Sequence, residues 1–162
     1  MKLVRVTFPT KRVLGRQELV SFPAFGLVNV EAKIDTGAFT AALHCTHQRV
    51  ETDAATGRPV LRVRLFDERH PQHDGRTLSF PEFEEREIRN SFGDVQRRYV
   101  IRAAVVLFGQ PLETEFSLSD RTDLRFPVLL GRALLQQGGF VVDVARRNVS
   151  YKFTQRQKRK TQ

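Results

Sequence analysis

The chain has 162 residues, a length that suits one domain with a buried hydrophobic core. Its single cysteine, Cys45, excludes an internal disulfide and is typical of a reducing compartment. It contains no run of about 18 apolar residues, the minimum for a membrane-spanning helix. Its first residues mix charged and apolar side chains as a strand does, unlike a signal peptide. We therefore expect a cytoplasmic protein with no membrane partner.

Residues 3–8 are the first segment with the alternation of apolar and polar side chains that predicts a β-strand. The same pattern follows at residues 18–22, 28–34, 60–66, 97–108 and 112–118. Gly109 and Pro111 lie between the last two segments and predict a hairpin. Residues 140–144 and 148–153 are expected to pair as two further strands. Residues 67–76 are polar and predict an exposed loop.

Only one segment, residues 131–137, has a convincing helical pattern, and Gly138 and Gly139 are expected to end it. Many short strands with turns between them favour a sandwich or a barrel over a sheet built from βαβ units. The sequence therefore predicts an all-β fold with one short helix.

The net charge of +9 is concentrated at the C-terminal end. Residues 146–162 hold seven of the 27 basic residues and none of the 18 acidic ones, so residues 1–145 are close to neutral. A basic arm attracts anionic partners, but short basic tails are also common as solvated, disordered segments. We expect a single domain over residues 1–153 and a disordered basic tail over residues 154–162.

The sharpest chemical feature is Asp35-Thr36-Gly37-Ala38, which directly follows the strand at residues 28–34. Such an arrangement can hold a carboxylate at the end of a strand. Gly37 permits a tight turn, and the Thr36 hydroxyl can form a hydrogen bond to a partner loop. An ordinary turn between strands has the same composition, so this tripeptide alone is weak support for a function.

A second segment, Phe126 to Arg132, joins an apolar strand to the predicted helix through Leu129-Leu130-Gly131-Arg132. This segment becomes informative because it follows Asp35 in the chain at a separation of about 95 residues. Together the two segments resemble the retropepsin-like aspartic proteases. The resemblance is closer to a bacterial subgroup that carries the label "ATP-dependent zinc protease" and is associated with ATP-grasp glutamate ligases.

The resemblance covers most of the chain as an ordered series of short motifs. They are Gly15-Arg16-Gln17-Glu18, the turn at residues 21–26, residues 32–38 with 41–44, residues 89–93, residues 98–100, Ser119-Asp120-Arg121 and residues 129–132. Phe39 stands where the family usually has Arg, and Ala41 stands where it has Ser. The resemblance implies a closed retropepsin-like (acid protease) β-barrel.

The resemblance also implies an aspartic peptidase in which two carboxylates share one proton and activate a water molecule. Asp35, Thr36 and Gly37 would be the catalytic residues. Because the chain supplies one Asp-Thr-Gly, Asp35 of a second copy would complete the pair in a homodimer. Asp120 is an alternative second group, although a structural role, pairing with an arginine at a turn, is the preferred interpretation.

Further roles follow from the same resemblance. Ala38 would contact substrate, and Arg89, Ser91 and Gly93 would form a hairpin flap over the cleft, unless this is an ordinary hairpin turn. Leu130, Gly131, Arg132 and Asp120 would give structural support, with Arg132 pairing to a carboxylate. A glutamate-rich peptide or protein tail is the substrate hypothesis, with a functional link to an ATP-grasp ligase.

No cofactor or metal is expected, because His44, Cys45 and His47, or His70 and His73, do not give a standard set of zinc ligands. No phosphate-binding loop of the Walker type occurs. Cys45 next to His44 lacks an orienting group and is expected to be a buried thiol. Two other interpretations remain open: a basic β-barrel that binds an acidic protein or, less favoured, nucleic acid, and a catalytically silent protease-like scaffold.

Overall fold

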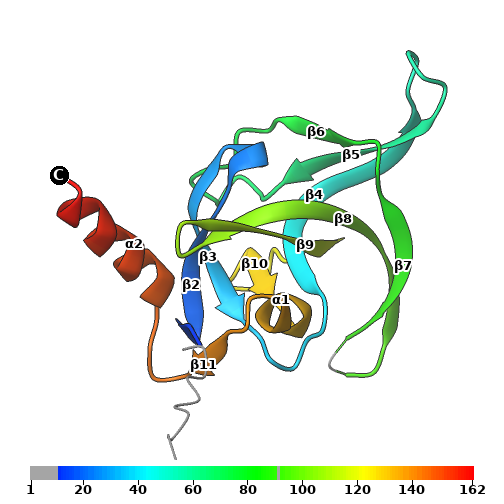
Figure 1. Cartoon of the computed structure of the whole chain (residues 1–162). Coiled ribbons are helices and arrows are strands. Elements are labelled where there is room, and N and C mark those ends of the chain that lie inside the picture. The colour runs from blue at the N-terminus through cyan, green and yellow to red at the C-terminus, as the bar shows by residue number, and fades with distance from the viewer. Residues whose placement is uncertain (1–10, 91) are drawn as a thin grey trace, which may run out of the picture.

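The computed structural model describes residues 11–90 and 92–162 and is mostly β, with two α-helices and one 3-10 turn (Figure 1). The expected strand at residues 3–8 lies outside the described residues. The elements in chain order are β1 (Val13–Gly15), β2 (Gln17–Phe22), η1 (Pro23–Phe25), β3 (Leu27–Ile34), β4 (Ala41–Thr52), β5 (Pro59–Leu65), β6 (Thr77–Phe80), β7 (Glu84–Arg89), β8 (Val95–Leu107), β9 (Gln110–Ser119), β10 (Val128–Leu130), α1 (Arg132–Gln137), β11 (Val141–Asp143) and α2 (Val149–Lys160).

Six strands form a ring that encloses the core. Their order is β10-β3-β2-β8-β9-β4, and β10 pairs with β4 as well as with β3, which brings the path back to its start. Strand β7 pairs with β8 outside this path, while β5 and β6 extend it beyond β4. The largest fully buried side chains come from several of these strands and include Phe22, Leu43, Ile101 and Phe116. Their burial supplies the main driving force for closing the sheet.

Most of the predicted elements are present. The strands expected at residues 18–22, 28–34, 60–66, 97–108 and 112–118 correspond to β2, β3, β5, β8 and β9. The predicted hairpin is confirmed, because β8 and β9 are antiparallel with Ile101 opposite Phe116. The helix expected at residues 131–137 is α1. None of the helices in the described ranges is long and apolar enough to cross a membrane.

The C-terminal end differs from the expectation. Residues 148–153 do not form a strand, and β11 pairs in parallel with β1 instead. The helix α2 takes in residues 149–160, so the segment expected to be a disordered tail is helical through Lys160. Val149 and Phe153, four residues apart, lie on one face of α2: Val149 packs on the core and the Phe153 ring lies 5.5 Å from that of Phe108. The alternating sequence thus also fits a helix with two apolar anchors.

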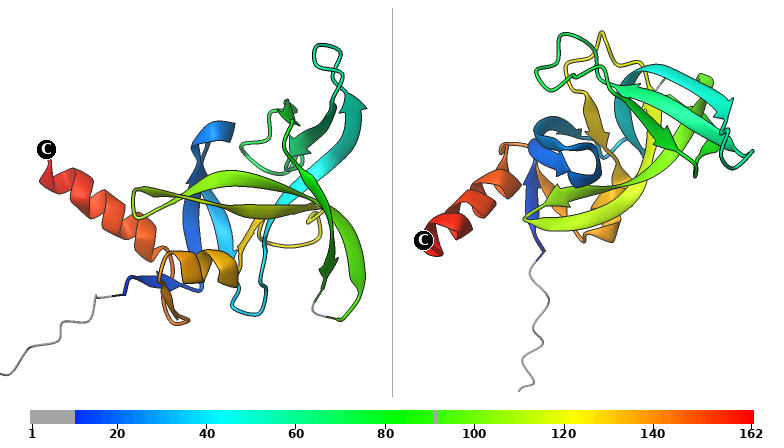
Figure 2. Two further views of the ribbon diagram at one scale, coloured as in Figure 1. Left: turned by 45° about the vertical axis from the view of Figure 1, so that its right-hand side comes forward. Right: turned by 90° about the horizontal axis from the view of Figure 1, so that it is seen from above.

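The first turn of α2 is attached to the body by a buried carboxylate. Glu18 of β2 accepts hydrogen bonds from the backbone N–H groups of Val149 at 3.0 Å and Ser150 at 3.1 Å. The Ser150 hydroxyl accepts a hydrogen bond from Phe108 N. Beyond this turn the helix projects away from the strands (Figures 1 and 2). A single side chain from β2 therefore caps the helix in place of a local capping residue.

Candidate active site

Asp35 lies directly after β3, where backbone hydrogen bonds fix the chain from two sides. Ile34 N donates to Arg16 O at 3.0 Å, and Asp35 N donates to Leu130 O at 2.9 Å. Strand β3 pairs in parallel with β10, with Ile34 opposite Leu130. The position of Asp35 is therefore set by the ring of strands and not by a mobile loop.

The Asp35 side chain is turned back over its own tripeptide and remains partly open. Its Oδ1 accepts a hydrogen bond from Gly37 N at 2.9 Å, and its Oδ2 lies 3.7 Å from Lys33 Nζ. The side chain is 26% exposed. A Cβ on residue 37 would lie only 3.2 Å from Oδ1, which favours glycine there. The carboxylate keeps lone pairs free for a water molecule or a second carboxyl group.

The segment Leu130-Gly131-Arg132 contacts the turn after Asp35. Arg132 N donates to Ala38 O at 2.7 Å, and the Arg132 guanidinium donates to Thr36 O at 3.0 Å. A Cβ on Gly131 would lie 2.8 Å from Ala38 O, so the close approach requires glycine. Arg132 was expected to pair with a carboxylate. It contacts a backbone carbonyl instead, because the Asp35 turn presents its carbonyl groups to the start of α1.

A buried histidine, His44, connects three segments near this end of β10. Its Nδ1 accepts a hydrogen bond from Arg121 N at 2.8 Å, so the ring proton is on Nε2, which donates to Asp67 Oδ2 at 3.0 Å. The Arg69 guanidinium and N–H, together with His44, hold the pKa of Asp67 below its usual range. His44 therefore connects β4 to the loop after β5, through Asp67, and to the loop after β9, through Arg121.

Asp120 is engaged in its own turn. Its Oδ1 accepts a hydrogen bond from Thr122 N at 2.9 Å and lies 3.9 Å from His44 Nδ1. The contact with Thr122 lowers the pKa of Asp120, and the side chain is 71% exposed. In the described residues its turn contact is with Thr122 and not with the arginine that was expected.

Arg121 is a functional candidate that the sequence did not single out. Its Nε donates to Phe126 O at 3.0 Å, and burial lowers its pKa, as does the positive charge of Arg98, while the charge of Asp35 acts in the opposite direction. Burial also lowers the pKa of Arg98. Arg121 thus lies within electrostatic range of both the Asp35 carboxylate and a second partly buried arginine, Arg98. Only the motif Ser119-Asp120-Arg121 pointed to this segment.

The hairpin of β7 and β8 has the predicted tip. Arg89 donates to Gly93 O at 3.2 Å, and Gly93 has a φ of +88°. Asn90 Oδ1 accepts hydrogen bonds from Phe92 N and Asp94 N, while Ser91 lies outside the described residues. The tip and the loop after Asp35 lie at the same end of the molecule (Figures 1 and 2). This placement is compatible with a flap.

The residues considered as metal ligands or as a thiol nucleophile have other surroundings. In residues 11–90 and 92–162, no group of three or more His, Cys, Asp or Glu side chains is arranged to hold a metal ion. Cys45 is buried, and burial raises the pKa of its thiol to about 12. A thiol with such a pKa is a poor nucleophile near neutral pH.

Comparison with known proteins identifies relatives over most of the chain. "Probable alpha-L-glutamate ligase" proteins of Shewanella halifaxensis and Desulfotalea psychrophila are 29% and 32% identical to it over 126 residues. These matches cover 75% of the chain but 26% of each relative, so the chain spans about a quarter of their length. The crystal structure of Lpg0085, a Legionella pneumophila protein of unknown function, has the same fold, with a TM-score of 0.64 and 22% identity over 87% of this chain and 99% of that one.

The sequence model of one family, described as the retropepsin-like aspartic endopeptidase RimB, matches residues 13–153. This range begins at β1 and includes the Asp35 turn, the segment Leu130-Gly131-Arg132 and the first turn of α2. Because the match extends over most of the chain, the protein belongs to the RimB-like family of retropepsin-like aspartic endopeptidases.

Proposed function

We propose that the protein is an aspartic endopeptidase in which Asp35 and Asp35 of a second copy share one proton. The observation that carries this proposal is the Asp35 carboxylate itself. The backbone N–H groups of Ile34 and Asp35 are held by Arg16 O and Leu130 O, whereas the Asp35 side chain accepts one N–H and stays partly exposed. In this interpretation the ring of six strands is the closed barrel of the retropepsin-like fold.

The second carboxylate is assigned to another copy because the chain supplies one Asp-Thr-Gly. Asp67 binds His44 and Arg69, and Asp120 lies in a separate turn beside His44. The surface near Asp35 suits a partner: Phe39 is 59% exposed and Phe92 is 90% exposed at the same end of the molecule. Exposed aromatic side chains of this size favour an interface. A two-fold axis at this end would bring the two Asp35 side chains together.

The proposed reaction is direct hydrolysis. The ionised carboxylate takes a proton from water as the water oxygen attacks the peptide carbonyl, and the protonated carboxyl group gives its proton to the carbonyl oxygen. The resulting diol collapses when the nitrogen gains a proton and the C–N bond breaks. One peptide and one water give a carboxylic acid and an amine, and the pair of carboxyl groups again holds one proton.

The other groups of the site position this pair. Arg132 holds Thr36 O, and α1 holds the carbonyl groups of Ala38 and Phe39. The described part of the hairpin tip, Asn90 and residues 92–94, lies where it could cover the bound substrate. A glutamate-rich peptide is the proposed substrate, because Arg121 is a positive charge near Asp35, with Arg98 beside it, and relatives are named as glutamate ligases. We place the reaction in the cytoplasm, next to a ligase that adds glutamate.

The first experiment compares cleavage of a glutamate-rich peptide by wild type, Asp35→Asn and Asp120→Asn between pH 4 and 8. Asp35→Asn is expected to lower kcat by about 10³-fold or more, since it removes the general base. Asp120→Asn is the matched control and is expected to keep activity within about threefold. Full activity in Asp35→Asn, or complete loss in Asp120→Asn, contradicts the assignment.

A mixing experiment tests the shared pair. Wild type and Asp35→Asn are combined at equal concentration and left to exchange subunits. If both carboxylates are needed, the mixture has about one quarter of the activity of wild type at the same total concentration, because only wild-type homodimers cleave. A monomeric enzyme would retain about half. About half of the activity would contradict the shared pair in a homodimer but would still support the peptidase function.

A further inference from the structure

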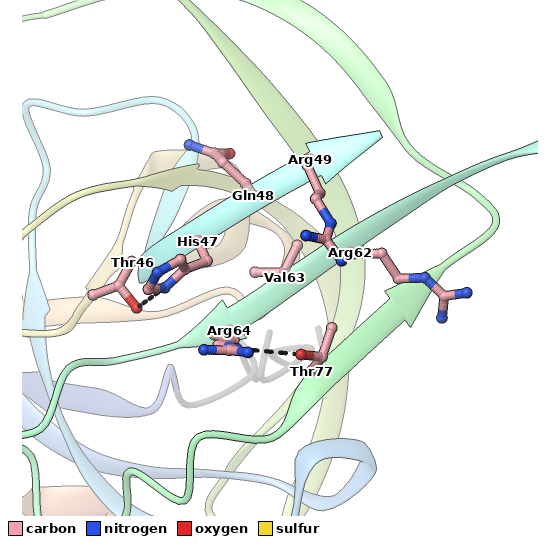
Figure 3. Close-up of a pocket in the computed structure, with 8 residues that line it drawn as sticks. All are labelled: Thr46, His47, Gln48, Arg49, Arg62, Val63, Arg64 and Thr77. Carbon is pink, nitrogen blue, oxygen red and sulfur yellow. Dashed lines mark hydrogen bonds between the residues drawn. The ribbon is translucent and has the colours of Figure 1, made fainter. Parts of the chain in front are cut away.

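A cationic face lies on the part of the sheet that extends beyond the ring. His47, Arg64 and Thr77 are in register across β4, β5 and β6, and Arg49, Arg62 and Ser79 form the next row on the same face. All residues of the two rows except Ser79 line a pocket of about 340 Å³, together with Thr46, Gln48 and Val63 (Figure 3). On β4 the pocket begins near His47, six residues after Ala41, where the loop that follows Asp35 ends. At about 3.3 Å per residue, the two positions are roughly 20 Å apart.

The pocket has more positive than negative charge. Glu51 pairs with Arg49 at 2.5 Å and with Arg62 at 3.2 Å, so one carboxylate serves two guanidinium groups. Arg64 is exposed and donates to the uncharged Thr77 hydroxyl at 3.3 Å. His47 lies beside Arg64 and is 3.2 Å from the Thr46 hydroxyl. Among the described residues, no ion pair is formed by Arg64, and its charge is available to an anionic ligand.

The geometry favours an extended peptide over other anions. Successive rows on a strand are about 6.6 Å apart, the same spacing as alternate side chains of an extended peptide. Strand β6 pairs only with β5 in the described residues, so its outer edge can accept an added strand. The lining residues include no Phe, Tyr or Trp and one imidazole, that of His47, whereas single-stranded nucleic acids are usually held by stacking on several aromatic rings.

We propose that this pocket is a second binding site for carboxylate groups of an extended acidic polypeptide, with Arg64 and Arg49 as its main contacts. The inference rests on the proposed peptidase function and extends it. The pocket holds a part of the substrate away from the bond that is cleaved. It therefore acts on substrate binding and leaves the chemistry at Asp35 unchanged.

The test measures binding in the Asp35→Asn protein, which keeps the pocket but does not cleave. A fluorescent peptide of ten glutamates is titrated, with a peptide of ten glutamines as the uncharged comparison. Arg64→Glu is expected to weaken binding of the acidic peptide by at least about tenfold, and Arg64→Gln by about threefold. Arg159→Glu on α2 makes the same change in net charge and is expected to alter affinity by less than about twofold.

Several outcomes would overturn the site. Equal losses in Arg64→Glu and Arg159→Glu would show attraction by overall charge, and an equally tight glutamine peptide would exclude carboxylate recognition. Tighter binding of a ten-nucleotide RNA that is sensitive to Arg64→Glu would assign the pocket to nucleic acid. In cleavage by the otherwise wild-type enzyme, Arg64→Glu should raise KM without lowering kcat.

The two proposals fail separately. Binding that depends on Arg64, in a protein whose wild type does not cleave, removes the peptidase and keeps the pocket. Cleavage whose KM is unaffected by Arg64→Glu keeps the peptidase and removes the pocket. Thermal unfolding of each variant checks that the exposed substitutions leave the fold intact.

Discussion

Two carboxylates on neighbouring strands, Glu18 of β2 and Asp35 after β3, have opposite surroundings. Glu18 is fully buried, and its oxygens accept three backbone N–H groups, from Gly15, Val149 and Ser150. Asp35 accepts one N–H, from Gly37, and is partly exposed. A carboxylate whose hydrogen-bonding capacity is used within the fold holds structure together. One that keeps free lone pairs at the surface is available for chemistry.

Burial also affects the protonation of Glu18. Removal from water raises the pKa of Glu18, although the N–H groups of Gly15, Ser150 and Val149 and the charge of Lys152 act in the opposite direction. Desolvation therefore outweighs the hydrogen bonds at Glu18. The following substitutions test whether the two carboxylates have separate roles, from the largest expected effect to the smallest.

Glu18→Ala is expected to lower the free energy of unfolding by at least about 3 kcal/mol, because three buried N–H groups lose their acceptor. Urea unfolding followed by far-UV circular dichroism would measure the loss, including the signal of α2. The specific activity of the molecules that remain folded should stay near that of wild type. Asp35→Asn is the reciprocal control, with a change in stability within about 0.5 kcal/mol. A Glu18→Ala protein that folds fully and does not cleave would contradict a purely structural role for Glu18.

Gly131→Ala tests how closely the Asp35 turn must fit against α1. The new Cβ would lie 2.7 Å from Phe39 O and 2.8 Å from Ala38 O, so the turn and the helix must move apart. We expect a loss of about 2 kcal/mol in stability and a fall of more than tenfold in kcat. Thermal unfolding and initial rates of peptide cleavage measure the two effects. Unchanged rates would mean that this contact does not position Asp35.

The sequence predicts the segments around Asp35 better than it predicts the attachment of α2 through Glu18. An alternating strand that runs into Asp35-Thr36-Gly37, and a helix at residues 131–137, are local patterns, and both are present. The helix α2 is capped by Glu18, 131 residues earlier in the chain, and no local pattern records that contact. The long strand β4 was also missed, since Ala41 to Cys45 are buried in succession and do not alternate.

The roles of His44 and Arg121 were hidden for a similar reason. His44 has a buried partner only because the fold brings Asp67 and the N–H of Arg121 to the two sides of its ring. Gly15 is a further case: a Cβ there would lie 2.4 Å from Arg146 O, in the segment that leads to α2. The motif Gly15-Arg16-Gln17-Glu18 thus gains a physical meaning, as the attachment point of the C-terminal helix.

Glu18→Gln tests how the contribution of Glu18 to stability depends on pH. Because the pKa of Glu18 is raised above 4.5 in the folded protein, the folded state holds the proton more tightly than the unfolded state. Its contribution to stability is complete below the unfolded pKa and is lost as pH rises through the folded pKa. The stability of wild type minus that of Glu18→Gln should therefore fall between pH 4 and 8. A difference that rises with pH would mean that the three N–H groups outweigh burial.

Arg132→Ala has the smallest expected effect, because the hydrogen bond to Thr36 O is exposed and the α1 backbone also holds the turn. We expect a loss of about 0.5 kcal/mol in stability and a decrease of about threefold in kcat, with KM unchanged. Arg97→Ala, which removes an exposed arginine from β8, is the control and should leave both unchanged. A 10³-fold loss of kcat in Arg132→Ala would mean that its guanidinium contacts the reacting groups. Catalysis by the partly exposed Asp35 carboxylate would then require the positive charge of Arg132 as well as the geometry of the turn.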